Sequence, residues 1–339
     1  MSTQPSAAPS VATPQQQIIA AIMGFRQSRA IAAAADLGLA DLLANGPLHI
    51  DSLAEMTLTH SRSLFRMMRA LESAGIFAQV SPRVFANTPV SECLRSNVPG
   101  SLRSAVRAVL SSGHGEYDAW AGFAHSVRTG EPAFDHVYGY DFWEFLERNP
   151  DQRSVYNESQ QTASGLFAAA VAGAYDWGRF SVIADLGGGT GTLLKAILDR
   201  YAACRGILFD LPEAVSKAIP HARAERAGGS FFEAVPSGAD AYILKSVVHD
   251  FPDAQVGAIL NNIRKVLQPE GRLALVENVI TDSPESIWAK WADLHMLALL
   301  GGAERTAAEY SELLGNSGFE LQEIVPTKSP FSILIGRPH

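Results

Sequence analysis

The sequence predicts an α/β fold in which a doubly wound, largely parallel sheet ends in a β-hairpin and follows a mostly helical domain. An apolar run over 182–186 leads into a glycine cluster at 187–191, which is typical of a buried strand, a sharp turn and a helix start. Two later runs, 206–209 and 241–244, end in polar residues, as parallel strands do at a ligand-binding edge. Residues 321–325 and 331–335, separated by a Pro-containing turn, predict the closing hairpin.

Composition predicts a large core and a reducing environment. With 339 residues, 47% of them hydrophobic, the chain is long enough for two domains. The formal charge of -8 gives no general attraction to nucleic acid or to an anionic membrane. Cys93 and Cys204 fall in different predicted domains, so we expect no disulfide framework and a cytoplasmic location. We also expect no apolar run of membrane-span length and no secretion signal.

The elements divide into four segments. Residues 1–14, rich in Ser, Thr, Pro and Ala, predict a disordered tail. Residues 15–97 predict a winged-helix-like domain, because a helical pattern stops near Gly75 and two short strands, 76–78 and 83–86, follow around a turn. Residues 98–175 predict helices that link the domains and line a substrate pocket, and residues 176–339 form the α/β domain. The helical face before Gly75 consists of Leu64, Met67, Met68 and Leu71.

The N-terminal domain allows two interpretations. Seven arginines lie between His60 and Arg107 against only Glu72 and Glu92, so a DNA-binding winged helix is one of them. The arginines are scattered over several elements, which weakens that interpretation. The other is a homodimer, because the first helix carries more large apolar residues than a small domain buries alone; they include Ile18, Ile19, Ile22, Met23 and Phe25.

The glycine cluster predicts a nucleotide-like ligand at the end of the first strand. Glycines allow positive φ and the close approach of a ligand to the backbone. A dinucleotide fingerprint needs a third glycine where this chain has Thr192, so the NAD interpretation is the weaker one. Asp210, at the end of the second strand, is placed to accept hydrogen bonds from ribose hydroxyls.

The next strand places a histidine at the same edge of the sheet. Residues 240–244 predict a buried strand that breaks into polar groups, with His249 where chemistry would be done. Asp253 is then expected to cap a helix that ends before Pro269. The following strand, 272–277, ends in Glu277, and sheet order places that acid beside His249.

Six segments in order resemble the small-molecule O-methyltransferases of the caffeic-acid type and their bacterial natural-product relatives, which are class I S-adenosylmethionine-dependent enzymes. The resemblance covers about residues 15–337 and implies a Rossmann-like methyltransferase fold with a dimerisation domain. The segments are 185–191, 209–212, 228–232, 244–251, 276–278 and 301–306.

The resemblance implies S-adenosylmethionine as cofactor, converted to S-adenosylhomocysteine. The residues that it assigns to cofactor binding are Asp185, Gly187, Gly189, Asp210, Leu211, Ser230, Phe231 and Lys245. The family usually has an acid where this chain has Ser230, so the contact to the adenine amino group is expected to be weaker or rerouted. The sequence shows no cluster of acids and amides of the kind that holds a catalytic divalent metal, so metal-independent catalysis is expected.

The resemblance also implies a catalytic group and an acceptor site. His249 is the general base, and Glu277 and Glu304 match the acids that flank it in the family. Glu304 could instead pair with Arg305 in a solvated loop, and Asp250 could bond to backbone or guide Lys245. The residues placed toward the substrate are Tyr156, Asn157, Gln160, Asp250, His295 and Met296, and many relatives have Met where this chain has Gln160.

Three functions follow from the sequence. The first is methyl transfer to a hydroxyl, phenolic by expectation, of a small aromatic natural product. The second is a non-methylating reaction on the same fold and cofactor, such as hydroxylation, decarboxylation or a pericyclic step. The third is a winged-helix regulator that senses S-adenosylmethionine. His249 with both acids favours the first.

Overall fold

The computed structural model describes residues 12–339, apart from the side chain of Glu285. The chain divides into two compact units, the first ending at His114 and the second running from Gly115 to His339. The first unit therefore extends past residue 97, where the sequence places the domain boundary. Its last helix, α6 (Arg103–Leu110), bonds to the end of α1, since Arg103 Nε donates to the Ala35 carbonyl at 2.9 Å and Arg107 Nε to Asp36 at 3.0 Å.

The first unit is a winged-helix arrangement. Its three-stranded antiparallel sheet has the order β1-β3-β2, with β1 at Leu48–His49, β2 at Phe77–Ser81 and β3 at Val84–Asn87. The predicted hairpin around the Ser81–Pro82 turn is confirmed. Five helices pack around this sheet with α6: α1 (Pro14–Asp36), α2 (Leu39–Leu42), α3 (Ile50–Met56), α4 (Ser61–Ser73) and α5 (Pro89–Glu92). The helix stop at Gly75, which has a φ of +75°, is also as expected.

Helix α1 presents apolar side chains to solvent over its first turns. Thr13 caps it through a reciprocal capping box with Gln16, so ordered helix begins inside the segment predicted as a disordered tail, and residues 1–11 of that tail lie outside the described residues. Five large apolar side chains, Ile18, Ile19, Ile22, Met23 and Phe25, are 52–66% exposed.

The apolar character of α1 corrects one expectation from the sequence. By length and composition alone it could cross a membrane, contrary to the expectation that no apolar run approaches that length. The run escapes notice because Arg26 and Arg29 interrupt it. A single helix of this kind near the N-terminus is weak evidence for a span, and an exposed apolar face is also what a dimerisation helix presents.

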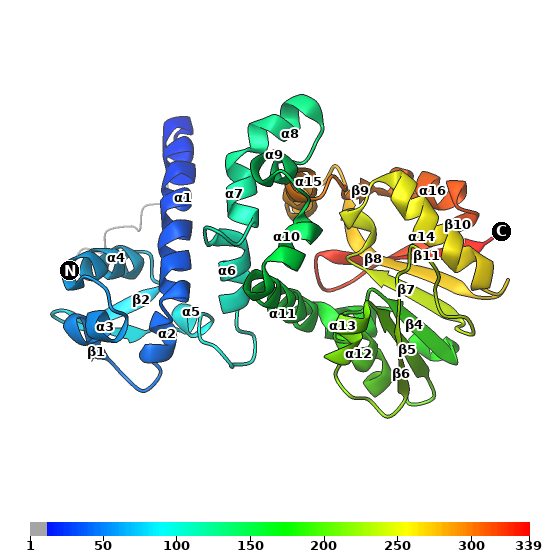
Figure 1. Ribbon diagram of the computed structural model, residues 1–339, viewed down its shortest axis with the longest axis horizontal. Coiled ribbons are helices and arrows are strands. Elements are labelled where there is room, and N and C mark those ends of the chain that lie inside the picture. Colours follow the sequence, from blue (N-terminus) through cyan, green and yellow to red (C-terminus); the bar gives the residue numbers. More distant parts are fainter. Residues whose placement is uncertain (1–11) are drawn as a thin grey trace, which may run out of the picture. The chain divides into compact units, whose positions relative to one another are not determined.

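The second unit is built on a twisted sheet with the strand order β10-β11-β8-β7-β4-β5-β6 (Figure 1). Strands β8, β7, β4, β5 and β6 are parallel, and the hairpin β10–β11 joins antiparallel to β8, as the sequence predicts. The short β9 (Arg305–Thr306) pairs with the end of β8. The strand bounds are β4 Val182–Leu186, β5 Arg205–Asp210, β6 Ala224–Gly228, β7 Ala241–Lys245, β8 Arg272–Ile280, β10 Phe319–Pro326 and β11 Phe331–Pro338.

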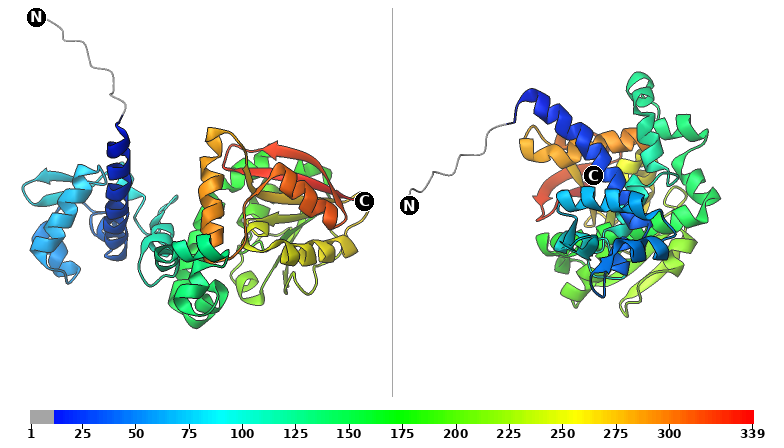
Figure 2. Two further views of the ribbon diagram at one scale, coloured as in Figure 1. Left: turned by 90° about the horizontal axis from the view of Figure 1, so that it is seen from above. Right: turned by 90° about the vertical axis from the view of Figure 1, so that its left-hand side faces the viewer.

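Helices cover both faces of this sheet (Figure 2). Helix α11 (Pro150–Ala174), α12 (Thr192–Arg200) and α13 (Pro212–Ser216) pack on one face around Trp177 and Ile197. Helix α14 (Asp253–Val266) and α16 (Ala307–Asn316) pack on the other around Ile259 and Tyr310. Asp253 does not cap α14 with its side chain, contrary to expectation; the carboxylate pairs with Arg305 instead.

Short helices form an aromatic cluster beside the sheet. They are α7 (Glu116–Ala121), α8 (Phe123–Thr129), α9 (Ala133–Tyr138), α10 (Phe142–Arg148) and α15 (Ile287–Leu299). The core of the cluster is Phe134, whose ring lies 5.3 Å from that of Phe142 and 5.5 Å from that of Phe145. Tyr156, from α11, packs against it with its ring 5.2 Å from Phe142. The cluster thus connects α11 and α15, the two helices predicted to carry acceptor contacts.

Candidate active site

The glycine loop between β4 and α12 forms an open backbone turn at the carboxyl edge of the sheet. Gly187, Gly189 and Gly191 have φ values of +67°, +58° and +82°, which side chains rarely adopt. The loop is tied to β5, because the Gly187 N–H donates to the Phe209 carbonyl at 2.8 Å. A Cβ on Gly188 would lie 2.7 Å from Asp185 Oδ2, so the loop closes directly over that carboxylate.

Asp185 is a buried acid with an uncompensated oxygen. It is 1% exposed, and its Oδ2 has no hydrogen-bond partner. Burial raises the pKa of Asp185 to about 7, Lys245 opposes the rise, and Asp210 adds to it. An unpaired buried carboxylate is costly, so this position suits a ligand that brings positive charge.

Lys245 lies near the same acid at the end of β7. Its Nζ is 3.4 Å from Ser164 Oγ and 3.3 Å from Ser246 Oγ, and it lies 4.9 Å from the centre of the Phe331 ring. Burial lowers the pKa of Lys245, while Glu277, Asp185 and Asp250 oppose that effect. The charges of three carboxylates therefore favour the ammonium form of Lys245.

Asp210 connects the glycine loop to the next strand. Its Oδ2 accepts from the Gly189 N–H at 2.8 Å and its Oδ1 from the Leu211 N–H at 2.6 Å. Burial raises the pKa of Asp210, and these two donors oppose the rise. Each oxygen keeps lone pairs that ribose hydroxyls could use.

Beyond Asp210, side chains form a partly exposed apolar surface. Leu211 is 56% exposed, and Phe231 lies 3.4 Å from where a Gly187 Cβ would be. Asn262, from α14, holds the 231–232 backbone by donating to both carbonyls at 3.0 Å. The half-buried Ser230 accepts from the Phe232 N–H at 3.3 Å and presents no charge there.

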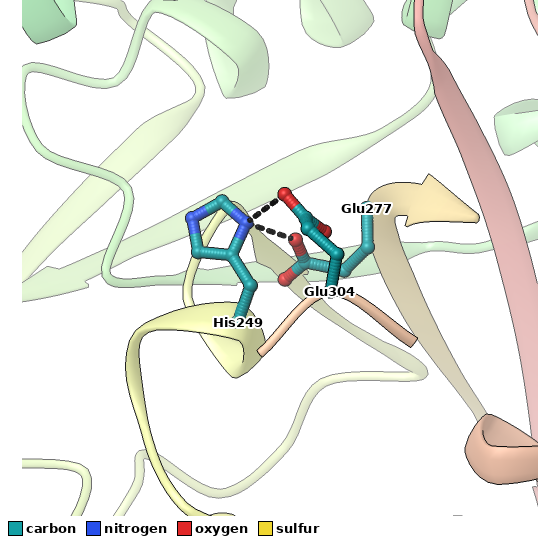
Figure 3. Close-up of side chains that lie close together, drawn as sticks. All are labelled: His249, Glu277 and Glu304. Atoms are coloured by element: carbon teal, nitrogen blue, oxygen red, sulfur yellow. Dashed lines mark hydrogen bonds and ion pairs between the residues drawn. The ribbon is translucent and has the colours of Figure 1, made fainter. Parts of the chain in front are cut away.

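His249 lies on the short 3-10 turn Val248–Asp250 that follows β7, and three carboxylates lie near its ring. Figure 3 shows two of them, Glu277 and Glu304. Nδ1 is 3.1 Å from Glu277 Oε2 and 3.1 Å from Glu304 Oε1. Nε2 is 3.3 Å from Asp250 Oδ1. Burial disfavours the imidazolium, but the charges of Glu277 and Asp250 outweigh it, so the pKa of His249 lies well above 6.5.

Glu277 fixes the turn as well as the ring. The side chain is fully buried, and its Oε1 accepts from the Val247 and Val248 N–H groups at 3.0 and 2.9 Å. The preceding Ser246 has a φ of +52°, a strained conformation for a side-chain-bearing residue. The carboxylate thus satisfies the two backbone donors that this tight turn leaves free.

Glu304 reaches the ring from the loop before α16. It is 3% exposed, and its Oε1 also accepts from Asn278 Nδ2 at 2.7 Å. Its own N–H donates to Asp293 of α15 at 3.1 Å. Glu304 therefore faces His249, and the alternative of a solvated pair with Arg305 is wrong.

Arg305 stabilises the backbone of the His249 turn, a role that the sequence did not predict. Its guanidinium donates to the carbonyls of Val248 at 3.2 Å and Phe251 at 3.1 Å, on either side of His249 and Asp250, and it pairs with Asp253 at 2.7 Å. Gly302 is equally close, since a Cβ there would lie 2.0 Å from the His249 carbonyl oxygen. The only sequence signal for either residue was its place in the 301–306 segment.

The residues predicted to face the acceptor differ in how deeply they are buried. Tyr156 lies in the aromatic cluster, and burial, followed by the charges of Asp250 and Glu116, raises its pKa well above 10. Met296 is buried, whereas Asn157 and Gln160 are exposed in this structure. A hydrogen bond with the Gln160 side chain opposes the rise at Tyr156.

His295 is fully bonded. Its Nδ1 accepts from Trp120 Nε1 at 2.9 Å, and its Nε2 is 3.2 Å from Glu116 Oε2. Because Nδ1 accepts, the proton of the ring is on Nε2 and is donated to Glu116. Trp120 and Glu116 belong to a segment that carries no motif, so the sequence gave no reason to select them.

The described residues contain one group with the composition of a metal site, and it is His249 with Glu277 and Glu304, whose ligand atoms lie within 4.8 Å of one another. The backbone and Asn278 donors already occupy one oxygen of each glutamate. The arrangement is accounted for by carboxylates that orient and charge a histidine, the same arrangement found around catalytic histidines in general.

Comparison with known proteins identifies the family. Residues 120–320 match the O-methyltransferase domain, and residues 19–97 match the O-methyltransferase dimerisation domain. The chain is 39% identical over 324 residues to the phenazine O-methyltransferase PhzM of Lysobacter antibioticus, covering 94% of each protein. It is 34% identical over 313 residues to the mitomycin biosynthesis 6-O-methyltransferase of Streptomyces lavendulae, covering 90% of this chain and 89% of that one. The chain belongs to the S-adenosylmethionine-dependent O-methyltransferases.

Solved structures agree with this assignment. The crystal structure of LaPhzM superposes with a TM-score of 0.91 at 38% identity, covering 96% of this chain and 100% of that one. The structure of NcsB1 from neocarzinostatin biosynthesis, in complex with S-adenosylmethionine and a naphthoic acid, gives a TM-score of 0.82 at 29% identity, over 98% of this chain and 100% of that one. S-adenosylmethionine is the cofactor of this family, and the open glycine loop, the uncompensated Asp185 and the acceptors of Asp210 fit it.

Proposed function

We propose that this protein transfers a methyl group from S-adenosylmethionine to a phenolic hydroxyl of a small aromatic natural product, with His249 as general base. The observation that carries the proposal is the position of His249 Nδ1, 3.1 Å from the buried carboxylates of both Glu277 and Glu304. Two acceptors at Nδ1 hold a proton there, which leaves Nε2 as the ring atom that can accept one.

S-adenosylmethionine supplies an electrophilic methyl group on a sulfonium. The protein contributes alignment of the acceptor oxygen and removal of its proton, since a phenol with a pKa near 10 is mostly protonated at neutral pH. His249 Nε2 takes that proton, and Glu277, Glu304 and Asp250 stabilise the resulting imidazolium. General-base catalysis of this kind contributes about 10²- to 10⁴-fold to the rate.

The raised pKa of His249 has a consequence for the pH dependence. The base is the neutral ring, so below its folded-state pKa most molecules hold the inactive imidazolium. The rate is therefore expected to increase with pH through a value above 6.5. The stability of the folded protein changes with pH in the opposite direction to the rate. The raised pKa of His249 contributes stability that is complete below about pH 6.5 and is lost as the pH rises through the folded-state pKa.

Two alternatives remain within the family, and a relative marks the first. The phenazine-1-carboxylate N-methyltransferase of Pseudomonas aeruginosa is 31% identical over 317 residues, so the acceptor atom is the part of the proposal most open to change. A nitrogen acceptor that is already unprotonated needs no base, and the buried carboxylates around His249 favour an acceptor that loses a proton. A non-methylating reaction on the same cofactor is the second alternative.

We also propose that the protein is a cytoplasmic homodimer formed through its first unit. The exposed apolar face of α1, defined by Ile18, Ile19, Ile22, Met23 and Phe25, supports the dimer. The free thiols of Cys93 and Cys204 support a reducing compartment. Light scattering that reports a monomer at micromolar concentration contradicts the dimer.

The experiment that tests the function is mass spectrometry of hydroxylated aromatic compounds incubated with the protein and isotopically methyl-labelled S-adenosylmethionine. We expect a labelled methyl ether and stoichiometric S-adenosylhomocysteine. Label on nitrogen selects the N-methylating alternative, and tight cofactor binding without methylation of any compound selects the non-methylating one. A sequence-specific electrophoretic shift of duplex DNA in the absence of methylation would support the regulator instead.

A further inference from the structure

The acceptor side of His249 is lined by carboxylates. The ring atom available to the acceptor, Nε2, is 3.3 Å from Asp250 Oδ1, so an acceptor oxygen bonded to Nε2 lies within a few ångströms of that charge. On the other side of the ring, Nδ1 lies 3.1 Å from Glu277 Oε2 and 3.1 Å from Glu304 Oε1. The side chain of Asp250 is 16% exposed and those of both glutamates are fully buried, so solvent screens these charges little.

A fourth carboxylate, that of Glu116, lies on α7. Glu116 is 5% exposed and 3.2 Å from His295 Nε2. Trp120 donates to the other ring nitrogen of His295, so Nε2 is the ring atom that faces Glu116. Trp120, one turn after Glu116 on α7, and Tyr156 pack against the same aromatic cluster, so Glu116 belongs to the part of the fold that carries Tyr156.

The cations near this group are already engaged. Lys245 bonds to Ser164 and Ser246 and lies over the Phe331 ring, and the charges of Glu277, Asp185 and Asp250 act on it. Arg305 is bound to Asp253 and to backbone carbonyls. No guanidinium or ammonium in the part of the chain that the structure describes is recorded in contact with Tyr156, His295 or Glu116.

We propose that the acceptor is a neutral or cationic hydroxylated aromatic compound, and that the carboxylates of Asp250 and Glu116 exclude acceptors that bear a carboxylate of their own. This inference rests on the proposed methyl transfer to a hydroxyl and adds the charge of the substrate. A carboxylate brought into the site meets like charges at low dielectric, where repulsion is far stronger than in water. A hydrogen-bond donor or a positive group at the same place is favoured.

The test compares each hydroxylated aromatic acid with its own methyl ester, which removes the charge and keeps the scaffold. Suitable scaffolds are phenol, naphthol and hydroxyphenazine, with the carboxyl group not adjacent to the hydroxyl, so that no internal hydrogen bond alters the phenol. Both kcat/KM and affinity in the presence of S-adenosylhomocysteine are measured, because affinity does not depend on turnover. We expect the ester to exceed the acid by about tenfold or more in both.

Two variants assign the discrimination to its residues. Glu116→Gln and Asp250→Asn are expected to reduce the ester-to-acid ratio of affinities, each by about threefold or more, whatever they do to the absolute rates. Glu270→Gln, an exposed acid remote from the site, is the matched control and leaves the ratio unchanged. Acids that bind as well as or better than their esters overturn this inference and leave the proposed function standing. Absence of binding and of methylation for every scaffold, with cofactor bound, contradicts the proposed function itself.

Discussion

The two halves of the catalytic edge differ in how far they are completed by the protein itself. At the ends of β7 and β8, the backbone of the His249 turn is held within the chain: Glu277 accepts from two of its N–H groups, and Arg305 donates to two of its carbonyls. The oxygens there that lack a hydrogen-bond donor, Glu277 Oε2 and Glu304 Oε2, belong to carboxylates whose charge already pairs with His249. At the end of β4, Asp185 Oδ2 is buried without a donor, and the glycine loop presents bare backbone. We call the groups around His249 the base half and the glycine loop with Asp185 and Asp210 the cofactor half. The base half is preorganised, whereas the cofactor half contains a buried charge that its ligand can compensate.

This contrast has an energetic meaning. Preorganised dipoles and charges cost no rearrangement during reaction, which is what a group that must accept a proton requires. An uncompensated buried acid lowers the stability of the free protein, and a cationic ligand recovers that loss on binding. Substitutions in the base half should therefore reduce turnover, and substitutions in the cofactor half should reduce affinity.

The largest effect is expected from His249→Ala. We expect cofactor affinity close to wild type and a loss of about 10²- to 10⁴-fold in kcat on a phenolic acceptor. The loss should shrink as pH approaches the pKa of the phenol, because solvent hydroxide then removes the proton. Single-turnover kinetics across pH measure this. A loss that stays constant up to alkaline pH would assign His249 to positioning, and full activity would remove the general base.

Arg305→Lys tests whether the base half depends on the fork geometry of the guanidinium. Lysine keeps the charge but cannot donate to the carbonyls of both Val248 and Phe251. We expect kcat to fall about ten- to a hundredfold, since small displacements of a catalytic group have effects of this size. The pH dependence of kcat should also shift in this variant, whereas its cofactor affinity should stay unchanged. Asp253→Asn, which changes only the exposed partner of Arg305, is the control and should stay within about twofold.

The sequence predicted the strands and the glycine loop because they depend on local patterns of apolar residues and glycine. It also placed His249 and Glu277 together, since parallel strands end at a common edge. It left open whether Glu304 faces Arg305 or His249, because that choice depends on β9 pairing with β8, a contact between segments with no periodic signal. Arg305 and Glu116 were missed for the same reason: their partners are distant in the chain, and burial of a charge is not visible in composition.

In the cofactor half, Asp210→Ala is expected to weaken binding of S-adenosylhomocysteine by about 1.5–3 kcal/mol, or roughly 10- to 150-fold, by removing charged acceptors for ribose hydroxyls. At saturating cofactor, kcat should be nearly unchanged, in contrast to the base-half variants. Calorimetry gives the affinity. Asp210→Asn keeps one acceptor for the Gly189 N–H and separates the loss of ligand contacts from loosening of the loop. Unchanged affinity in the alanine variant, or tight NADH binding to the wild type, contradicts the assignment.

The pKa of Asp185 predicts a pH dependence of cofactor affinity. With a pKa of about 7 in the free protein, the carboxylate is mostly protonated at pH 6 and mostly ionised at pH 8. If the ionised form holds the positive groups of the cofactor, affinity should rise up to about tenfold over that range. The stability of the free protein changes the other way: the raised pKa costs stability progressively from about pH 4 to pH 7, then levels off. Thermal unfolding with and without S-adenosylmethionine measures both, and Asp185→Asn should abolish the dependence.

The smallest expected effect concerns Ser230, where the family resemblance leads us to expect an acid. Ser230 Oγ accepts from the Phe232 N–H, and an aspartate can make the same bond to the backbone two residues on, so Ser230→Asp should leave the loop intact. Its second oxygen would then be free to accept from the adenine amino group. We expect binding of S-adenosylhomocysteine to tighten about two- to fivefold, or about 0.5–1 kcal/mol, with kcat unchanged. Ser230→Asn, which has the same shape without the charge, should give a smaller gain. A clear loss in both variants would mean that Ser230 lies in a different local geometry from the family's acid, and that the adenine is recognised by other groups.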